Sequence, residues 1–274
     1  MIPAAFEYRR ASSVDEAVGI LAEEGEDAKL LAGGHSLLPL MKLRLAAPSL
    51  LVDIGRIGEL SYVRGNGDTV EVGALTRHRD LETSDVLREH LPLLAHVAGQ
   101  VGDPQVRHRG TIGGSISHGD PASDLPAACL ALGATFTAVG TGGERRIPAE
   151  DFFQGFLETA LRPDEVLTKV SMPKAAGSGW SFQKFNRRAQ DWAIVGVAAV
   201  RGDRTGVALV NMGATPLRAT SVERALSGGA SATEAATHAA DGLDPPEDLN
   251  ASAEYRRHLA QVLVRRALEE AGAA

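Results

Sequence analysis

Two glycine-rich segments decide the fold of this chain: Ala32-Gly33-Gly34-His35-Ser36 and Thr111-Ile112-Gly113-Gly114-Ser115. Each follows or interrupts an apolar stretch and stands close to hydroxyl side chains. Because glycine has no Cβ, the backbone N–H groups of such a turn can approach a phosphate closely. Two such turns could hold a diphosphate from both sides, which predicts a dinucleotide bound outside the usual Rossmann arrangement.

The length and charge of the chain narrow its class. Its 274 residues are enough for two or three compact units, and a content of 44% hydrophobic and 23% charged residues is ordinary for a globular protein. The formal net charge of −7 argues against a general nucleic-acid binder. No stretch approaches the roughly 20 apolar residues of a membrane span, and the first ten residues lack the pattern of a signal peptide, so we expect a cytoplasmic protein.

The sequence contains a single cysteine, Cys129. An intrachain disulfide is therefore excluded, as are a cysteine-based zinc site and a self-contained iron–sulfur cluster, which normally takes four thiolates. Cys129 lies in the apolar run of residues 125–132, which predicts a buried packing residue. Any iron–sulfur chemistry linked to this protein must then lie on another chain.

Hydrophobic periodicity predicts a small parallel unit over about residues 1–55. Ser13 and Glu16 form a capping-box pattern at the start of its first helix. The order of strand, turn, helix and strand is typical of a parallel sheet. The expected elements are helices over residues 13–24 and 36–45 and strands over residues 29–32 and 50–54.

A linker over residues 174–179 divides the rest of the chain. Before it, the expected elements are strands 69–74, 134–139 and 164–170, a helix over 81–99 broken near Pro92, a helix over 125–132 and a hairpin tip at 140–144. After it, they are three strands of an antiparallel sheet (181–186, 193–200 and 207–212) and helices near 220–226, 232–240 and 253–271. On the last helix, the pattern predicts a solvated face that carries Arg256, Arg257, Arg265 and Arg266.

The second glycine segment and the residues after it are dense in groups that could bind a nucleotide. Thr111, Ser115 and Ser117 can bond phosphate or ribitol oxygens, and Asp124 can accept hydrogen bonds from sugar hydroxyls. For Asp120 we favour capping of the helix that begins near residue 123. Neither segment fits the G-x-x-x-x-G-K-S/T phosphate loop of an ATPase, and no G-x-G-x-x-G follows a strand.

The histidines show no spacing typical of metal ligands. His35 is expected to shape its turn. The others considered are expected to be surface residues or satisfied core groups: His78, His90, His96, His108 and His118.

Four separated motifs resemble those of a known family. They are residues 32–39 (Ala-Gly-Gly-His-Ser-Leu-Leu-Pro), residues 111–115 (Thr-Ile-Gly-Gly-Ser), residues 184–193 and residues 252–257. Together they are similar to the FAD-binding medium subunit of the molybdenum hydroxylases, in particular of aerobic carbon monoxide dehydrogenase, and more distantly to the FAD domain of xanthine dehydrogenase. The likeness covers essentially the whole chain.

The resemblance implies an α+β fold. An FAD-binding domain of the para-cresol methylhydroxylase type would occupy residues 1–175, with two α+β subdomains at about residues 1–55 and 56–175. A C-terminal medium-subunit flavoprotein domain, also α+β, would occupy residues 176–274 and contain the three-stranded antiparallel sheet and the helices.

The resemblance also implies which residues bind FAD. Trp192 falls where some relatives place a residue over the isoalloxazine face, so it either stacks on the flavin or packs in the core. Asp191 either tunes the flavin or pairs with Arg187 or Lys184. No catalytic or metal-binding residue is expected. The full expected set is Leu30, Leu31, Ala32, Gly33, Gly34, His35, Ser36, Leu37, Val101, Thr111, Ile112, Gly113, Gly114, Ser115, Asp124, Leu167, Lys184, Asp191 and Trp192.

The family implies a complex of three subunit types in a heterohexamer. A large subunit would hold the molybdenum cofactor, a small subunit would hold two 2Fe–2S clusters, and this chain would carry FAD. It would pass electrons from the nearer cluster to an acceptor such as a quinone, NAD or oxygen, and would not turn over substrate alone. Two alternatives stay open: a stand-alone flavin oxidoreductase and a non-catalytic flavin-binding assembly module.

Overall fold

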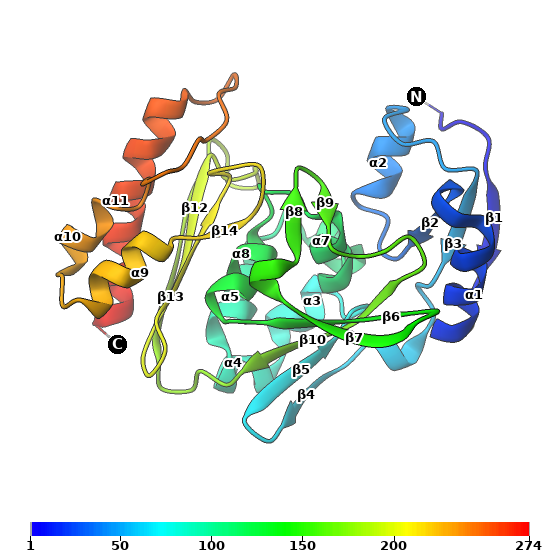
Figure 1. Ribbon diagram of the computed structural model, residues 1–274, viewed down its shortest axis with the longest axis horizontal. Coiled ribbons are helices and arrows are strands. Elements are labelled where there is room, and N and C mark those ends of the chain that lie inside the picture. Colours follow the sequence, from blue (N-terminus) through cyan, green and yellow to red (C-terminus); the bar gives the residue numbers. More distant parts are fainter. Residues whose placement is uncertain (1, 274) are drawn as a thin grey trace.

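The fold begins with a small parallel unit at one end of the molecule (Figure 1). The computed structural model describes residues 2–273. The sheet of this unit has the order β1-β3-β2, with both pairings parallel. Its elements are β1 (Glu7–Arg10), α1 (Val14–Glu24), β2 (Ala28–Leu31), α2 (Leu37–Lys42) and β3 (Leu50–Asp53). The predicted parallel unit is confirmed.

Strand β1 and the end of α2 differ from the sequence-based expectation. All four residues of β1 are exposed, so the segment lacks the apolar alternation by which a strand is recognised. It is held instead by backbone pairing with β3 along the edge of the sheet. Helix α2 stops at Lys42 rather than continuing to residue 45, because Arg44 takes a φ of 59°, which lies outside the right-handed helical region.

The second unit is built on a five-stranded antiparallel sheet with the order β4-β5-β10-β6-β7. Its strands are β4 (Val63–Asn66), β5 (Thr69–Gly73), β6 (Thr135–Gly140), β7 (Gly143–Pro148) and β10 (Val166–Pro173), and a separate hairpin contains β8 (Phe153–Gly155) and β9 (Glu158–Thr159). Its helices are α3 (His78–Thr83), α4 (Asp85–His90), α5 (Pro92–Gln100), α6 (Pro104–Arg109), α7 (Ile112–His118) and α8 (Asp124–Ala131). The strands predicted in this unit are confirmed to within a few residues.

The helical layer of this unit is more broken than predicted. The stretch expected as two helical pieces forms α3, α4 and α5. Ser84 is extended and its hydroxyl caps α4 by accepting the N–H of Leu87 at 3.3 Å, which ends α3 one residue earlier. Pro92 begins α5, where its missing N–H is not needed.

The second glycine segment is a helix rather than a turn. Thr111 caps α7 by accepting the N–H of Gly114 at 3.1 Å on its hydroxyl. The expectation that Asp120 caps the following helix is wrong. Its carboxylate accepts the N–H of Ala122 at 2.8 Å and closes a turn, because α8 begins only at Asp124.

The third unit is a four-stranded antiparallel sheet covered by helices. Its elements are β11 (Gly179–Phe185), β12 (Val195–Arg201), β13 (Gly206–Val210), β14 (Leu217–Arg218), α9 (Thr220–Ser227), α10 (Ala232–Ala236) and α11 (Ala253–Gly272). The three predicted strands are confirmed as β11, β12 and β13. The sheet has a fourth strand that was not predicted, β14, because two residues are too few to show a period. Arg265 and Arg266 are exposed as predicted, but Arg256 is fully buried, so the solvated face does not include it.

Helix α8 joins the second and third units. Its apolar side chains belong to the same core cluster as residues of β6, β10, β12 and β13. A Cβ on Gly206, at the start of β13, would overlap the carbonyl oxygen of Ala131, at the end of α8. Cys129 is fully buried in this helix, as predicted, and burial raises the pKa of its thiol to about 12.

Figure 1 shows the first unit (blue) and the third unit (yellow to red) on opposite sides of the second. The predicted domain boundaries near residues 55 and 175 stay predictions. Among the described residues, the helices lack the length and apolar character that crossing a bilayer would need.

A substitution of Phe136 tests the packing of the core in the second unit. It is fully buried and packs edge to face against Phe152, with ring centroids 4.7 Å apart. We expect Phe136→Ala to lower the free energy of unfolding by about 3–5 kcal/mol in urea denaturation. Leu249→Ala, at a fully exposed position, should change it by less than about 0.5 kcal/mol. Equal effects of the two substitutions would contradict this core.

Candidate functional site

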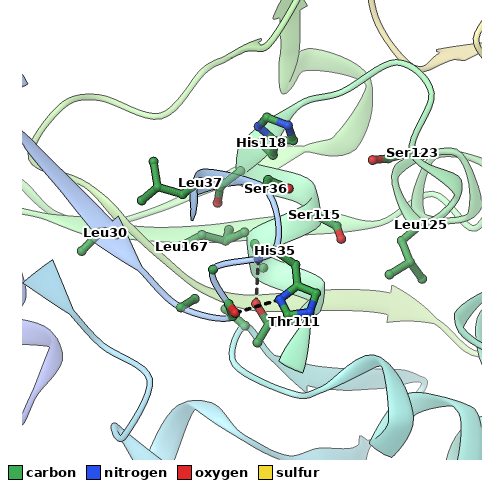
Figure 2. A pocket seen from close by; sticks show the side chains of 18 of the residues that line it. Leu30, His35, Ser36, Leu37, Thr111, Ser115, His118, Ser123, Leu125 and Leu167 are labelled. Carbon is green, nitrogen blue, oxygen red and sulfur yellow. Dashed lines mark hydrogen bonds between the residues drawn. The ribbon is translucent and has the colours of Figure 1, made fainter. Parts of the chain in front are cut away.

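A cleft of about 810 Å³ lies between the first and second units and reaches the third. It is lined by the loop after β2, by α7, by the end of β11 and by the loop that follows β11. Figure 2 shows His35 and Ser36 of the first loop close to Thr111 and Ser115. The two glycine segments, far apart in the sequence, therefore share one cleft.

Glycine is required where the walls of this cleft touch. A Cβ on Gly33 would overlap the carbonyl oxygen of Arg109 and lie 3.0 Å from the Cα of Gly110. A Cβ on Gly113 would lie 2.6 Å from the carbonyl oxygen of Ala74, which follows β5. These neighbours are backbone atoms in a closely packed region, so they cannot swing aside as a flexible side chain would. The missing side chains set how closely the first loop, α7 and β5 approach one another.

The backbone N–H groups of the two segments are used differently. Those of residues 112–115 all donate within the fold, for example from Gly113 to the carbonyl of Ala74 at 2.8 Å. No hydrogen bond among residues 2–273 uses the N–H groups of residues 33–37 as donors. Free amides are therefore a property of the first segment only, and the second segment contributes the hydroxyls of Thr111 and Ser115. The imidazole Nδ1 of His35 lies 3.2 Å from the carbonyl oxygen at residue 33 and shapes the turn, as predicted.

His78 lies behind the second segment and lines the cleft. Its Nε2 is 3.4 Å from the Oγ of Ser115, and its Nδ1 has no hydrogen-bond partner within residues 2–273. Burial lowers the pKa of His78 to about 4, with a further contribution from His35 and Arg77, so the imidazole is neutral at pH 7. The expectation of a satisfied core histidine is wrong here. No sequence motif marks His78 as a site residue. It lies beside the second segment because the neighbouring Arg77 pairs with Thr111 through an isolated backbone bridge.

A buried ion pair joins the second and third units at the wall of the cleft. The Nζ of Lys184 on β11 is 2.7 Å from Oδ2 of Asp124 and 3.2 Å from the carbonyl oxygen of Gln100. The two charged side chains are only 9% and 6% exposed. Burial raises the pKa of Asp124 to about 6, although Lys184 opposes the shift. The second carboxylate oxygen, Oδ1, is buried without a partner in the part of the chain that the structure describes.

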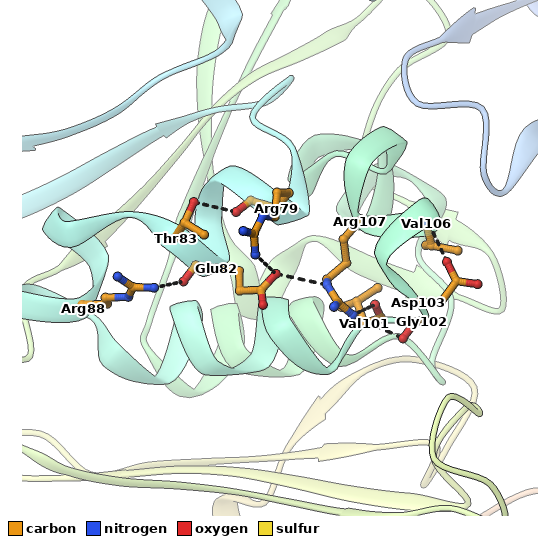
Figure 3. A network of polar contacts seen from close by, with 9 residues as sticks. All are labelled: Arg79, Glu82, Thr83, Arg88, Val101, Gly102, Asp103, Val106 and Arg107. Carbon is orange, nitrogen blue, oxygen red and sulfur yellow. Dashed lines mark hydrogen bonds and ion pairs between the residues drawn. The ribbon is translucent and has the colours of Figure 1, made fainter.

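A polar network outside the cleft holds the stretch around Val101 (Figure 3). Glu82 accepts a hydrogen bond from Nε of Arg107 at 3.1 Å and lies 3.3 Å from Nη1 of Arg79. Arg107 in turn donates to the carbonyl oxygens of Val101 and Gly102 at 3.2 and 3.4 Å. Val101 lines the cleft and is positioned by side chains that do not reach it.

Trp192 and Asp191 stand at the end of the cleft that the third unit provides. Trp192 is 58% exposed, which excludes core packing for it. The carboxylate of Asp191 accepts the N–H of Trp192 at 3.0 Å. It pairs with neither predicted partner, because Lys184 faces α8 and Arg187 donates to Asn250 at 2.8 Å. The pairing interpretation of Asp191 is wrong, and a role beside a flavin stays a prediction.

The predicted site residues line the cleft, except Leu31 and Ile112. Ile112 is fully buried because its side of α7 faces the core. The lining also includes Thr159, Arg162 and Glu165, which the sequence analysis did not single out. They lie in β9 and the stretch before β10, where the sequence carries no nucleotide-binding pattern. Contact of the predicted residues with a cofactor stays a prediction.

Two family matches cover nearly the whole chain. Residues 4–175 match the family described as "FAD binding domain in molybdopterin dehydrogenase". Residues 180–271 match the family described as "CO dehydrogenase flavoprotein C-terminal domain". The chain belongs to this family of FAD-binding dehydrogenase subunits.

Individual relatives agree with this membership. The chain is 45% identical to the carbon monoxide dehydrogenase medium chain of Hydrogenophaga pseudoflava, over 100% of this chain and 99% of the relative. It is 39% identical to the 6-hydroxypseudooxynicotine dehydrogenase complex subunit alpha of Paenarthrobacter nicotinovorans, over 99% of this chain and 96% of the relative. A solved structure of the H. pseudoflava carbon monoxide dehydrogenase, which lacks the Mo-pyranopterin moiety, superposes with a TM-score of 0.97 at 46% identity, over 100% and 99% of the two chains. The protein is thus an FAD-dependent oxidoreductase subunit of the molybdenum-hydroxylase type, and the predicted α+β fold class is confirmed.

The contact at Gly33 gives a first prediction for this site. Gly33→Ala forces the first loop away from the backbone of Arg109, so we expect a loss of about 1–3 kcal/mol in stability and a clear weakening of FAD binding. Thermal unfolding and calorimetric titration with FAD measure the two effects. Gly142→Ala, at a hairpin tip with no atom within 4 Å of the added Cβ, is the matched control. Identical behaviour of the two variants would contradict the proposed contact.

The buried carboxyl of Asp124 predicts a pH dependence. Because folding raises its pKa to about 6, protonation favours the folded state: the gain is complete below the unfolded pKa and is lost as the pH rises through about 6. Relative to Asp124→Asn, the wild-type free energy of unfolding should fall by about 2–3 kcal/mol between pH 4 and pH 7. Urea denaturation of both FAD-free proteins measures this difference. Parallel pH profiles would show that the carboxyl titrates normally.

Proposed function

We propose that this chain is the FAD-carrying electron-transfer subunit of a molybdenum hydroxylase. It would accept electrons from iron–sulfur clusters on a partner subunit and deliver them to an external acceptor. The observation that carries the proposal is the run of free amides at residues 33–37, which faces the hydroxyls of α7 across one cleft. A run of free N–H groups is the feature that favours a diphosphate at this position.

The cleft fits FAD in three respects. The amides of residues 33–37 and the hydroxyls of Thr111 and Ser115 would hold the diphosphate. The unpaired Oδ1 of Asp124 would accept a hydrogen bond from a ribityl hydroxyl and so satisfy a buried acceptor. The exposed indole of Trp192 would pack against the isoalloxazine ring.

The side chains of the cleft bind and orient, and no acid–base step is assigned to them. FAD, when bound, supplies a group that takes up and gives up electrons singly or in pairs. His78 is neutral and buried behind Ser115, so it supports that hydroxyl without bringing a charge to the cleft. Lys184 brings a cation to the wall, neutralised by Asp124.

The remaining redox groups are assigned to partners. The single cysteine of the chain is fully buried in α8, so a thiolate-bound cluster has no ligands here. We infer a large subunit with the molybdenum cofactor and a small subunit with 2Fe–2S clusters, in a cytoplasmic heterohexamer. The two relatives described above are named for different substrates, carbon monoxide and 6-hydroxypseudooxynicotine, which fits a substrate site on the large subunit.

Cofactor retention tests the binding part of this proposal. The purified chain, mixed with FAD and passed through gel filtration, should keep the visible flavin bands. Gly34→Val should lose them, because residue 34 has a φ of +75° and an added Cβ would lie 2.9 Å from Leu38. Gly65→Val, on the exposed strand β4, should keep them. Equal retention by the two variants would contradict the assignment of the cleft.

Electron transfer is tested with the FAD-loaded chain and the chemically reduced iron–sulfur partner subunit. Mixing them should bleach the flavin bands, while the chain alone should not be reduced by small organic substrates such as aldehydes or purines. Rapid reduction of the isolated chain by such a compound would favour a stand-alone oxidoreductase. An FAD that is never reduced in the full complex would favour an assembly module.

A further inference from the structure

His78 is a buried polar side chain in the wall of the cleft between the first and second units. It is the first residue of α3 and is only 3% exposed, yet it lines the cleft. Its backbone N–H donates to the carbonyl of Gly110 at 3.0 Å, and a Cβ on Gly110 would lie 2.6 Å from Nε2 of the ring. The imidazole is therefore packed tightly against backbone, immediately beside the second glycine segment.

The two ring nitrogens of His78 have unequal surroundings. Nε2 is 3.4 Å from Oγ of Ser115, whereas Nδ1 is buried and has no hydrogen-bond partner within residues 2–273. The ring is neutral at pH 7, so one of the two nitrogens carries a proton. A proton on Nδ1 would be a buried N–H without an acceptor, which is rare in proteins, whereas a proton on Nε2 has Oγ of Ser115 as its acceptor. These surroundings favour the Nε2–H tautomer, which donates to Ser115.

The direction of this hydrogen bond decides what the hydroxyl of Ser115 offers to a ligand. A hydroxyl has one proton to donate and two lone pairs that accept. When Oγ accepts from His78, its proton stays available for a group in the cleft. A phosphate oxygen is an anionic acceptor, so it needs that proton. If Ser115 donated to Nε2 instead, only its oxygen lone pairs would face the phosphate, and the two would repel.

The hydroxyl of Thr111 has its direction set in the same way by a different group. Its Oγ1 accepts the N–H of Gly114 at 3.1 Å, which leaves its own proton as a donor. Thr111 and Ser115 both line the cleft, one helical turn apart (Figure 2). A backbone amide thus orients one hydroxyl and the imidazole of His78 orients the other, so that both present a proton on the side of the free amides at residues 33–37.

We propose that His78 is a positioning residue that holds the Ser115 hydroxyl as a hydrogen-bond donor to the diphosphate of the dinucleotide. The ring acts through Ser115 and does not itself contact the ligand. Because it is uncharged, it sets the direction of the hydroxyl without adding a cation behind it. The identity of the dinucleotide as FAD rests on the proposed function, but the direction of the hydrogen bond does not.

Calorimetric titration with FAD tests the coupling of the two side chains. We expect Ser115→Ala to weaken binding by about five- to twentyfold and His78→Leu by about three- to tenfold, because a hydroxyl without its partner can still rotate toward the ligand. The double variant should be weaker than Ser115→Ala by less than about twofold, since His78 acts through Ser115. His78→Gln, whose amide N–H replaces Nε2–H, should stay within about threefold of the wild type. His258→Leu, at an exposed position on α11, is the matched control and should bind FAD normally.

The tautomer is measured directly in the wild-type chain, so this test does not depend on how the variants fold. In a sample labelled with ¹⁵N-histidine, long-range ¹H–¹⁵N correlation spectra distinguish a ring protonated on Nε2 from one protonated on Nδ1. The signals that disappear in His78→Gln assign the ring of His78. We expect the Nε2–H tautomer both without and with FAD.

Three results would overturn the proposal. The first is an Nδ1–H tautomer for His78, and the second is an affinity of His78→Leu for FAD equal to that of the wild type. The third is full additivity of His78→Leu and Ser115→Ala in the double variant. Failure of the proposed function is distinguishable from these results: the wild-type chain would then not retain FAD, and the tautomer would still decide whether His78 donates to Ser115.

Discussion

The fold depends on a backbone contact that only glycine permits. Gly33 lies against the carbonyl of Arg109 and the Cα of Gly110, where any side chain would collide with main-chain atoms. This contact joins a loop of the first unit to the junction between α6 and α7 in the second unit. It leaves the amides of residues 33–37 facing the hydroxyls of Thr111 and Ser115. A ligand held from both sides would reinforce the contact, because binding only to the folded state adds to stability.

A second constraint closes the cleft from the other side. Burying the charges of Lys184 and Asp124 carries a desolvation cost, which their 2.7 Å contact offsets only in part. The raised pKa of Asp124 and its unpaired oxygen both result from the burial of this carboxylate. Such a pair contributes little as a stabilising device. It does link the end of β11 to the start of α8, a few residues before the loop that carries Trp192.

The sequence predicted best where one local pattern decides the structure. Helix α1 begins after Ser13, whose hydroxyl accepts the N–H of Glu16 at 3.1 Å, although the Glu16 carboxylate bonds to Ser12 rather than completing the expected box. Strands β1 and β14 escaped prediction because pairing with neighbours holds them, and their own residues show no period. The same reason explains Arg256: its burial depends on Asp248 and on the turn before β12, not on its place along the helix.

The glycine motifs predicted where the site lies, but not which segment has free amides and which contributes hydroxyls. Composition could identify small residues and hydroxyls near residues 111–115, yet only tertiary structure shows that the amides there are already bonded to Ala74 and Thr76. His78 belongs to the site through the fold alone.

Amide hydrogen exchange with and without FAD tests the central claim most directly. The account predicts that the amides of residues 33–37 exchange rapidly in the FAD-free chain and become protected when FAD is added. The amides of residues 112–115 should be protected in both states, because their hydrogen bonds lie within the fold. Unchanged exchange at residues 33–37 in a chain that binds FAD would contradict it.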